Sequence, residues 1–298
     1  MTSDPTLELE RMTWPEVRAA LDAGRTTVVF ACGAVEQHGP HLPLFTDAEH
    51  GSELSRRVAT ELGDALVAPT VRVGCSEHHM AFPGTISLEE STFAAVLRDY
   101  VRSLARHGFQ RICVIPSHGG NFAPVTHALP MLREAAGGAH VIAFTNLPAV
   151  INTWVRVAGE LGVGERVAGH ADIAESSVML ALHPDLVRTE AAEAGHPGPL
   201  TPELAERLFT HGMRAIAPNG ILGDARGLSA ELGERCIEEL VDVLVAYFRR
   251  EASEVTSVAY TAGKVDAKCH TPNCRSRPPT VNVRLTCIIR RAAVPGPA

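Results

Sequence analysis

Acidic and histidine side chains are concentrated in one short stretch, from Glu36 to Asp47. His38 and His41 lie between these two carboxylates. Glu36 and His38 are two residues apart, so their side chains point the same way if the chain is extended there. Carboxylate and imidazole ligands together suit Zn²⁺, Mn²⁺ or Fe²⁺. The stretch therefore indicates a metal site, and a polar loop with histidines in a turn is the alternative.

A second polar stretch reads Ser-His-Gly-Gly-Asn over residues 117–121 and directly follows an apolar segment. His118 offers another imidazole ligand, and the backbone N–H groups of Gly119 and Gly120 could hold an oxyanion. The alternatives are a glycine-rich turn with Asn121 as a helix cap, or the phosphate loop of a sugar or nucleotide binder. A phosphate loop would need basic residues beside the glycines, and none is close.

A third stretch contains His170, Asp172 and Glu175. The two acidic residues are three apart and share one face of an expected helix, with the histidine just before it. Acidic residues that only favour the helix dipole are the alternative. Residues 74–85 include two adjacent histidines and many turn residues, and they predict a rim or substrate loop.

Apolar runs alternate with amphipathic segments along the first 250 residues. Buried strands are expected over 26–31, 65–71, 111–115 and 140–144. Helices are expected over 14–23, 48–62, 89–107 with Ser87 as its cap, 123–136, 173–182 and 229–251. The alternation predicts an α/β fold with three layers, in which a mostly parallel central sheet is flanked by helices. Ligands bind at the carboxyl ends of strands in such folds, so the polar stretches after the strands are the expected site.

Composition narrows the class of protein. The chain has 298 residues, a net charge of −7 and 45% hydrophobic residues, so it can bury a sizeable core and is not an obvious nucleic-acid binder. No apolar run is long enough to span a bilayer, and the first residues do not resemble an export signal. Seven cysteines without disulfide-like spacing in the first 250 residues favour reduced thiols. We therefore expect a cytoplasmic protein.

The C-terminal segment differs from the rest of the chain. Residues 256–298 contain seven Lys or Arg and one acidic residue, together with proline-rich stretches. We predict a boundary near residue 255, with the main domain over 1–255 and a basic, poorly ordered tail over 256–298. The tail also holds potential zinc ligands whose spacing matches no strong pattern, namely Cys269, His270, Cys274 and Cys287.

Four blocks of this sequence together resemble the creatininase (creatinine amidohydrolase) family, over roughly residues 8–250. They read G-A-V-E-Q-H-G-P-H-L-P-L-x-T-D, F-P-G-T-I-S-L, S-H-G-G-N and H-A-x-x-x-E-S-S-x-M-L-A-L. The resemblance implies an α/β fold around a largely parallel sheet, two divalent metals per chain, hydrolysis of C–N bonds in cyclic or linear amides, and assembly as a homohexamer. It also matches Glu36, His38, Asp47 and His118 to metal ligands, with Asp47 bridging, and His170 to a catalytic histidine.

One position departs from the members that hydrolyse creatinine. They resemble G-H-Y-E-N in the second block and carry a glutamate ligand where this chain has Gly120. They also carry an aromatic pocket residue shortly before the catalytic histidine, and residues 166–169 supply none here. Creatinine is therefore not the expected substrate. The H-G-G-N pattern is more similar to members that act on formamides, on a peptide in mycofactocin maturation, or on cyclic sugar derivatives.

The missing carboxylate has two candidate replacements, Asp172 and Glu175. Glu175 is preferred, because it lies in the E-S-S-x-M-L segment and its side chain reaches further; Asp172 would then serve the helix N-terminus. Two metals could activate a shared water towards an amide carbonyl, with the Gly119 and Gly120 N–H groups on the oxyanion and His170 as proton donor. The expected partner is a small-molecule amide or a short peptide. A metal-binding module without activity is the alternative of a different class.

Overall fold

The computed structural model describes residues 6–265, with side chains described as far as residue 253. Four parallel strands form its central sheet in the order β2-β1-β3-β4. The strands are β1 (Thr27–Cys32), β2 (Ala65–Val67), β3 (Arg111–Pro116) and β4 (His140–Ala143). All but the first residues of β3 and β4 are buried, as expected for a sheet covered on both faces. The predicted parallel sheet is confirmed, although β2 ends four residues earlier than expected.

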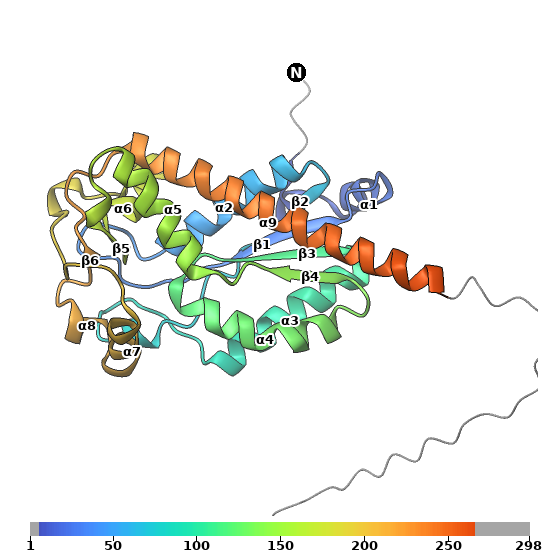
Figure 1. Ribbon diagram of the computed structural model, residues 1–298, viewed down its shortest axis with the longest axis horizontal. Helices are drawn as coiled ribbons and strands as arrows, with labels where there is room; N and C mark the ends of the chain where they lie inside the picture. Colours follow the sequence, from blue (N-terminus) through green and yellow to red (C-terminus); the bar gives the residue numbers. More distant parts are fainter. Residues whose placement is uncertain (1–5, 266–298) are drawn as a thin grey trace, which may run out of the picture. The chain divides into compact units, whose positions relative to one another are not determined.

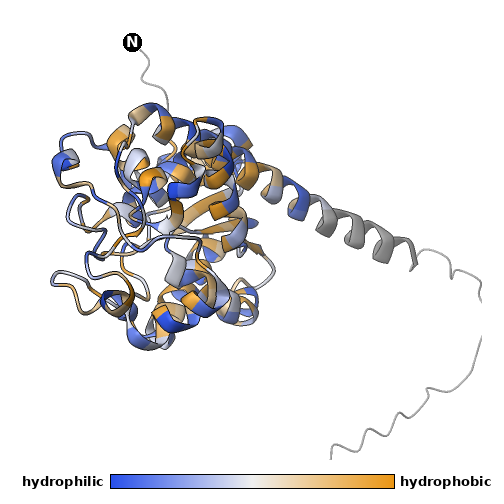
Figure 2. Cartoon of the chain, turned by 60° about the vertical axis from the view of Figure 1, so that its left-hand side comes forward, coloured by the Kyte–Doolittle hydropathy of each residue, from blue (hydrophilic) through white to orange (hydrophobic). Residues whose placement is uncertain are grey.

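Helices cover both faces of this sheet (Figure 1). One layer consists of α1 (Trp14–Asp22), α3 (Glu90–His107) and α4 (Phe122–Ala135). The other consists of α2 (Thr46–Leu62), α5 (Leu147–Glu160), α6 (Ile173–Leu182) and α9 (Ala230–Val265). Side chains of β1 alternate between the two cores, with Val28 and Phe30 packed in the first and Val29 and Ala31 in the second. Figure 2 shows these apolar strands inside and mixed polar and apolar residues along the helices. The three-layer prediction is therefore correct.

One predicted cap is wrong. Ser87 does not cap α3, whose N-cap residue is Glu89. The Ser87 hydroxyl instead accepts a hydrogen bond from the Ser76 N–H at 2.9 Å, and so it holds two parts of the 74–88 loop together.

A second, smaller group of elements follows the sheet in the sequence. An antiparallel pair is formed by β5 (Val167–His170) and β6 (Leu222–Gly223), with α7 (Pro202–His211) and α8 (Met213–Ile216) between them along the chain. Short 3-10 helices lie at Leu9–Arg11, Glu77–His79, Gly119–Asn121, Gly164–Arg166 and Thr189–Ala191. None of the strands and helices of this smaller group was predicted, and neither was α5.

The expected boundary near residue 255 falls inside α9, which continues to Val265. By its internal contacts the chain divides into residues 1–256 and 257–298. Residues 256–265 of the predicted tail belong to α9, and the rest of the tail, with its four possible zinc ligands, lies outside the described residues. Within the described part, no helix is long and apolar enough to cross a membrane.

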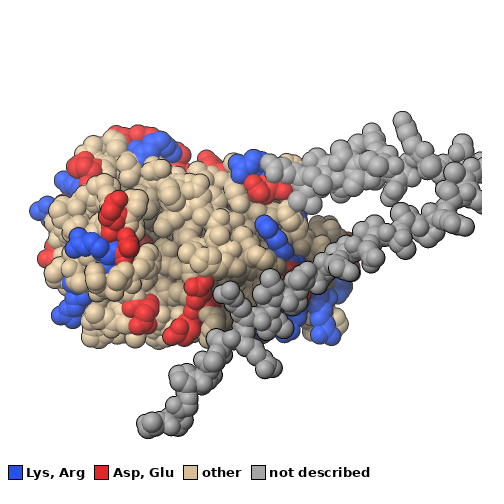
Figure 3. Space-filling view, turned by 60° about the horizontal axis from the view of Figure 1, so that its bottom comes forward, with Lys and Arg blue, Asp and Glu red and all other residues tan. Residues whose placement is uncertain are grey.

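The described cysteines Cys32, Cys75, Cys113 and Cys236 are free thiols. On the face seen in Figure 3, basic and acidic side chains are scattered over a surface that consists mostly of other residues.

Candidate metal centre

The three polar stretches meet at the carboxyl end of the sheet. Glu36 and His38 follow β1, and His118 comes two residues after the end of β3. Asp47 lies in the first turn of α2, where the positive end of the helix dipole favours a carboxylate. Glu175 lies in the first turn of α6, just after β5. Parallel strands that end at one edge thus collect ligands from distant parts of the sequence.

Two groups of three ligand atoms share Asp47. Glu36, Asp47 and His118 form the first group, and His38, Asp47 and Glu175 form the second. In the first, His118 Nδ1 lies 3.3 Å from Glu36 Oε1 and 3.2 Å from Asp47 Oδ2. In the second, His38 Nε2 lies 3.5 Å from Asp47 Oδ1 and 3.6 Å from Glu175 Oε2. One carboxylate oxygen of Asp47 therefore faces each group, as a bridging ligand requires.

The buried polar atoms of these groups are placed to bind a metal rather than to form hydrogen bonds with one another. Both carboxylate oxygens of Glu36, Asp47 Oδ2 and His38 Nε2 are inaccessible and make no hydrogen bond of good geometry. Buried polar atoms almost always have a hydrogen-bond partner, so four buried atoms without one in the same site require an explanation. Nitrogen and oxygen donors without thiolate suit zinc, manganese or iron, in agreement with the prediction.

The raised pKa values of three ligands also indicate that the site favours positive charge. Burial opposes the charged form of His38, but Glu175 and Asp47 outweigh it and hold the pKa of His38 well above its usual value. Burial likewise opposes protonation of His118, yet Glu36 and Asp47 raise its pKa to about 9. Burial raises the pKa of Glu36 to about 7. Metal ions would replace these protons, because imidazole binds metals in its neutral form.

The loop before α6 shows how Glu175 is aimed. Ala171 has φ = 52°, and it is the one residue other than glycine with positive φ in the described part of the chain. The Ala171 N–H donates to Glu175 Oε2 at 2.5 Å, which fixes the carboxylate beside His38. Such strained backbone is typical of sites whose surroundings impose it.

Asp172 has a different role. Its Oδ1 accepts the N–H groups of Ala174 and Glu175, and its Oδ2 accepts those of Ala168 and Gly169. Both oxygens are used within the loop, and Asp172 belongs to neither of the groups that share Asp47. The expectation that Asp172 serves the N-terminus of the helix is borne out by its position as the N-cap of α6.

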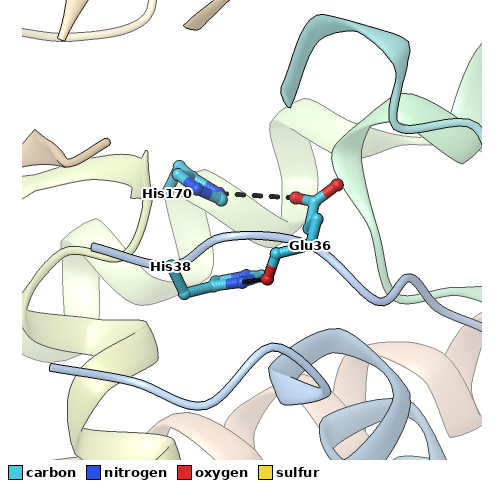
Figure 4. Close-up of side chains that lie close together, drawn as sticks. All are labelled: Glu36, His38 and His170. Atoms are coloured by element: carbon cyan, nitrogen blue, oxygen red, sulfur yellow. Dashed lines mark hydrogen bonds and ion pairs between the residues drawn. The ribbon is translucent and has the colours of Figure 1, made fainter. Parts of the chain in front are cut away.

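His170 is the last residue of β5, and its ring points toward the carboxylate of Glu36, with His38 beside both, as Figure 4 shows. Its Nδ1 is 3.9 Å from Glu36 Oε1, while its Nε2 is 3.0 Å from the backbone oxygen of Gln37. An N–H at Nε2 satisfies that carbonyl and leaves the Nδ1 lone pair towards the metal groups. Burial and the nearby His38 lower the pKa of His170 to about 3, so the ring is neutral.

The side chains of two residues that were not predicted, Gln37 and His79, pack around this histidine. The side-chain nitrogen of Gln37 lies 2.8 Å from His79 Nδ1 and 2.9 Å from His170 Nε2. His79 Nε2 in turn lies 3.4 Å from Glu36 Oε1. Gln37 could have been found from its place between two candidate ligands. His79 belongs to the segment predicted as a rim or substrate loop, and it reaches further into the site than that prediction implied.

Two other residues from the sequence analysis do not join the ligands. The ring of His41 is turned to Ser176, with Nε2 2.7 Å from the hydroxyl oxygen. Asn121 precedes α4 but makes no side-chain cap; its amide donates to the backbone oxygens of Cys32 and Gly33. It thus ties the end of β1 to the glycine turn.

Gly120 cannot be exchanged for a larger residue without movement of the site. A Cβ atom there would lie 2.4 Å from His118 Nε2 and 2.5 Å from the Cys75 oxygen. The site therefore has no room at residue 120 for the glutamate side chain that the members similar in sequence to G-H-Y-E-N carry there. Gly119 meets nothing within 4 Å of such an atom.

A cavity of about 550 Å³ opens onto the ligands. Asp47, His118, His170 and Glu175 line it, together with both glycines of the turn. Phe209 of α7 also lines the cavity and is 58% exposed; its ring centroid lies 4.7 Å from that of His78, with the two planes inclined by 56°. An aromatic side chain is thus present at the mouth, although it comes from a different segment than the one before His170.

Comparison with known proteins agrees with this site. The family model described as "Creatininase: Creatinine amidohydrolase" matches residues 10–248. A mycofactocin precursor peptide peptidase of Mycobacterium ulcerans is 33% identical over 246 residues, which cover 80% of this chain and 86% of that protein. The creatinine amidohydrolase of Pseudomonas putida is 32% identical over 255 residues, with 80% and 95% covered.

The fold is also found among solved structures. A structure named "Creatininase Mn" superposes with a TM-score of 0.67 at 29% identity, and the match covers 83% of this chain and 99% of that one. The sequence blocks, the sheet and these matches together show that the chain belongs to the creatininase family of amidohydrolases.

Proposed function

We propose that Glu36, Asp47 and His118 hold one divalent metal and that His38, Asp47 and Glu175 hold a second, so that this amidohydrolase works with a binuclear centre. The observation that carries the proposal is the carboxylate shared by the two groups of ligand atoms. Three buried carboxylates also need compensating charge, and no Lys or Arg lines the cavity within the described residues. Manganese in a related solved structure supports a divalent ion.

When bound, the two ions would lower the pKa of a shared water and polarise the amide carbonyl. Asp47 fixes the spacing between the two groups through its two oxygens. The backbone N–H groups of Gly119 and Gly120, which line the cavity, are our candidates for donors to the oxyanion. The apolar walls exclude bulk water and so strengthen these electrostatic interactions.

His170 is proposed to move the proton. Its neutral ring offers Nδ1 towards the ligands, so it can take a proton there from the attacking water. The same atom can then return that proton to the leaving nitrogen. The backbone oxygen of Gln37, which accepts the Nε2–H, keeps the ring in this orientation.

The proposed substrate is a small amide with an apolar group, because the cavity continues beyond the ligands between apolar walls. Phe122, Phe144 and Leu147 are among the residues that form these walls. A short peptide is the second candidate, and the 33% identity to peptidases named for the mycofactocin precursor supports it. Creatinine is not expected to be hydrolysed, because Gly120 leaves no room for the carboxylate.

Two measurements test this function. The purified chain, reconstituted with Mn²⁺ or Zn²⁺, is expected to hold close to two metals by elemental analysis. It is also expected to hydrolyse at least one member of a panel of formamides, lactams and short peptides with apolar groups. Failure to bind metal would contradict the binuclear centre, and a metal-loaded protein that hydrolyses no amide would contradict the activity.

Replacement of His170 by alanine is expected to slow turnover by about 100- to 10,000-fold, the usual contribution of a general acid or base. The metal content should stay at two, because His170 belongs to neither group that shares Asp47. His196→Ala provides a control at a partly exposed histidine that does not line the cavity. Loss of one metal in the His170 variant would instead show that it is a ligand, in the alternative group with Glu36 and His38.

We further propose a cytoplasmic homo-oligomer, most simply the hexamer implied by the family resemblance. Large apolar side chains on the surface support an interface, including Trp14, which is 82% exposed, Met80 and Ile86. Light scattering at working concentration should give a mass several times that of one chain. A monomeric mass would reject the proposal.

A further inference from the structure

The deep end of the cavity contains two polar atoms without a partner. His50 Nε2 and Trp154 Nε1 are both buried and make no hydrogen bond. Their side chains are 3% and 5% exposed. The two rings face each other, with centroids 5.5 Å apart and planes inclined by 38°. Both residues line the same cavity as Asp47 and Glu175.

These two side chains come from helices that pack on the same face of the sheet. His50 lies on α2 one turn after Asp47, so it extends the cavity inward from the bridging carboxylate. Trp154 comes from α5, more than one hundred residues later. Around them the cavity wall is fully buried and apolar, with Leu54 and Leu244. His50 and Trp154 thus line a buried part of the same cavity that the metal ligands line.

The chemistry of the two atoms restricts what can bind there. An indole N–H only donates, so the bound group must contain an acceptor. Burial lowers the pKa of His50, so its ring is neutral and Nε2 can either accept or donate. An anionic group would lack a cation, because no Lys or Arg lines the cavity within the described residues. A hydroxyl satisfies both atoms, since it accepts from Trp154 and can donate to His50 or accept from it.

We propose that His50 and Trp154 bind a hydroxyl group at the end of the apolar part of the substrate, and so select which amides this enzyme hydrolyses. The proposal rests on the function proposed above, because the ligands must hold the amide at one end of the cavity. It adds a second point of recognition deeper in the cavity. The unpaired donor and acceptor are then explained as a site that the substrate completes.

Matched pairs of hydroxamic acids can test the anchor without turnover. Hydroxamates chelate metals, so straight-chain alkyl hydroxamates should bind the metal-loaded protein at its ligands. The partner compounds carry one additional terminal hydroxyl, over a series of chain lengths. At the length that reaches His50 and Trp154, calorimetry should show binding about tenfold tighter for the hydroxylated compound, as expected for a pair of buried hydrogen bonds.

Two variants and one control make the result specific. His50→Leu and Trp154→Phe should remove the preference for the hydroxylated compound while they keep two metals and the affinity for the plain alkyl hydroxamate. Trp14→Phe, at an exposed tryptophan, should retain the preference. The chain has two tryptophans, so fluorescence of this control reports on Trp154 alone and should change when the hydroxylated compound binds.

The failures of the two proposals are distinguishable. Equal affinity within every pair, or a preference that survives both variants, would overturn the anchor and leave the amidohydrolase intact. Absence of binding by every hydroxamate to protein with two metals would overturn the proposed function, and the anchor with it.

Discussion

Replacement of Asp47 by asparagine is expected to empty both metal positions. Its two oxygens face separate groups, with Oδ1 towards His38 and Oδ2 towards His118. An amide keeps one oxygen, loses the charge and directs N–H groups at one imidazole. Elemental analysis after reconstitution should fall from about two metals to well below one, and turnover by at least about 1,000-fold, because the activated water is lost.

The control for this variant must separate charge in the site from charge at the helix. Glu49 is another acidic residue in the first turn of α2, but it pairs with Arg72 on the surface. Glu49→Gln should therefore reproduce any loss of helix stability, measured as a lower melting temperature, and keep both metals. If Asp47→Asn retains two metals and a normal rate, Asp47 does not bridge them.

The central sheet and its covering helices could be predicted because their residues carry the signal locally. The run Thr27–Cys32 is buried throughout, and its β-branched side chains were sufficient to identify a strand. The pair β5 and β6 could not be found in this way. Leu222–Gly223 is too short to show a period, and it pairs with a strand about fifty residues earlier in the sequence.

The missed helix α5 did carry usable signals. Asn146 accepts the Ala149 N–H as its N-cap, and a proline follows in the first turn, both typical of a helix start. Ser87 shows the opposite error. It stood at a plausible cap position, but the tertiary contact with Ser76 used its hydroxyl.

The candidate ligands could be listed from the sequence because metal chemistry needs particular residue types at the ends of strands. Which ligand joins which metal depends on packing between distant segments. The same is true of Gln37 beside His170, and of His50 beside Trp154, since each pair is brought together from segments more than one hundred residues apart. No local pattern in the sequence specifies such contacts.

The structure distinguishes the roles of Asp172 and Glu175, which the sequence offered as two candidates for the same carboxylate ligand. Asp172 accepts four backbone N–H groups, so Asp172→Asn should unfold the loop more easily rather than remove a ligand. An asparagine can accept on one side only, and the unpaired donors should cost about 1–3 kcal/mol of unfolding free energy. Thermal or chemical denaturation would measure this loss, and the folded fraction should still bind two metals. A folded Asp172→Asn protein with one metal would make Asp172 the ligand.

Replacement of Glu175 by glutamine is expected to have the complementary result. The glutamine oxygen can still accept the Ala171 N–H, so the loop and the melting temperature should be largely preserved. The second group would, however, lose the charge of Glu175 and retain only His38 and the shared Asp47 as ligands. These are fewer than the three protein ligands that a catalytic zinc site usually has. Elemental analysis should therefore find about one metal, held by Glu36, Asp47 and His118, and activity should fall by at least about 1,000-fold because one ion alone lacks the shared water. The control is Glu165→Gln, at an exposed acidic residue shortly before β5, and it should keep both metals and full activity. Two metals and a normal rate in the Glu175 variant would show that the second ion takes its carboxylate from elsewhere.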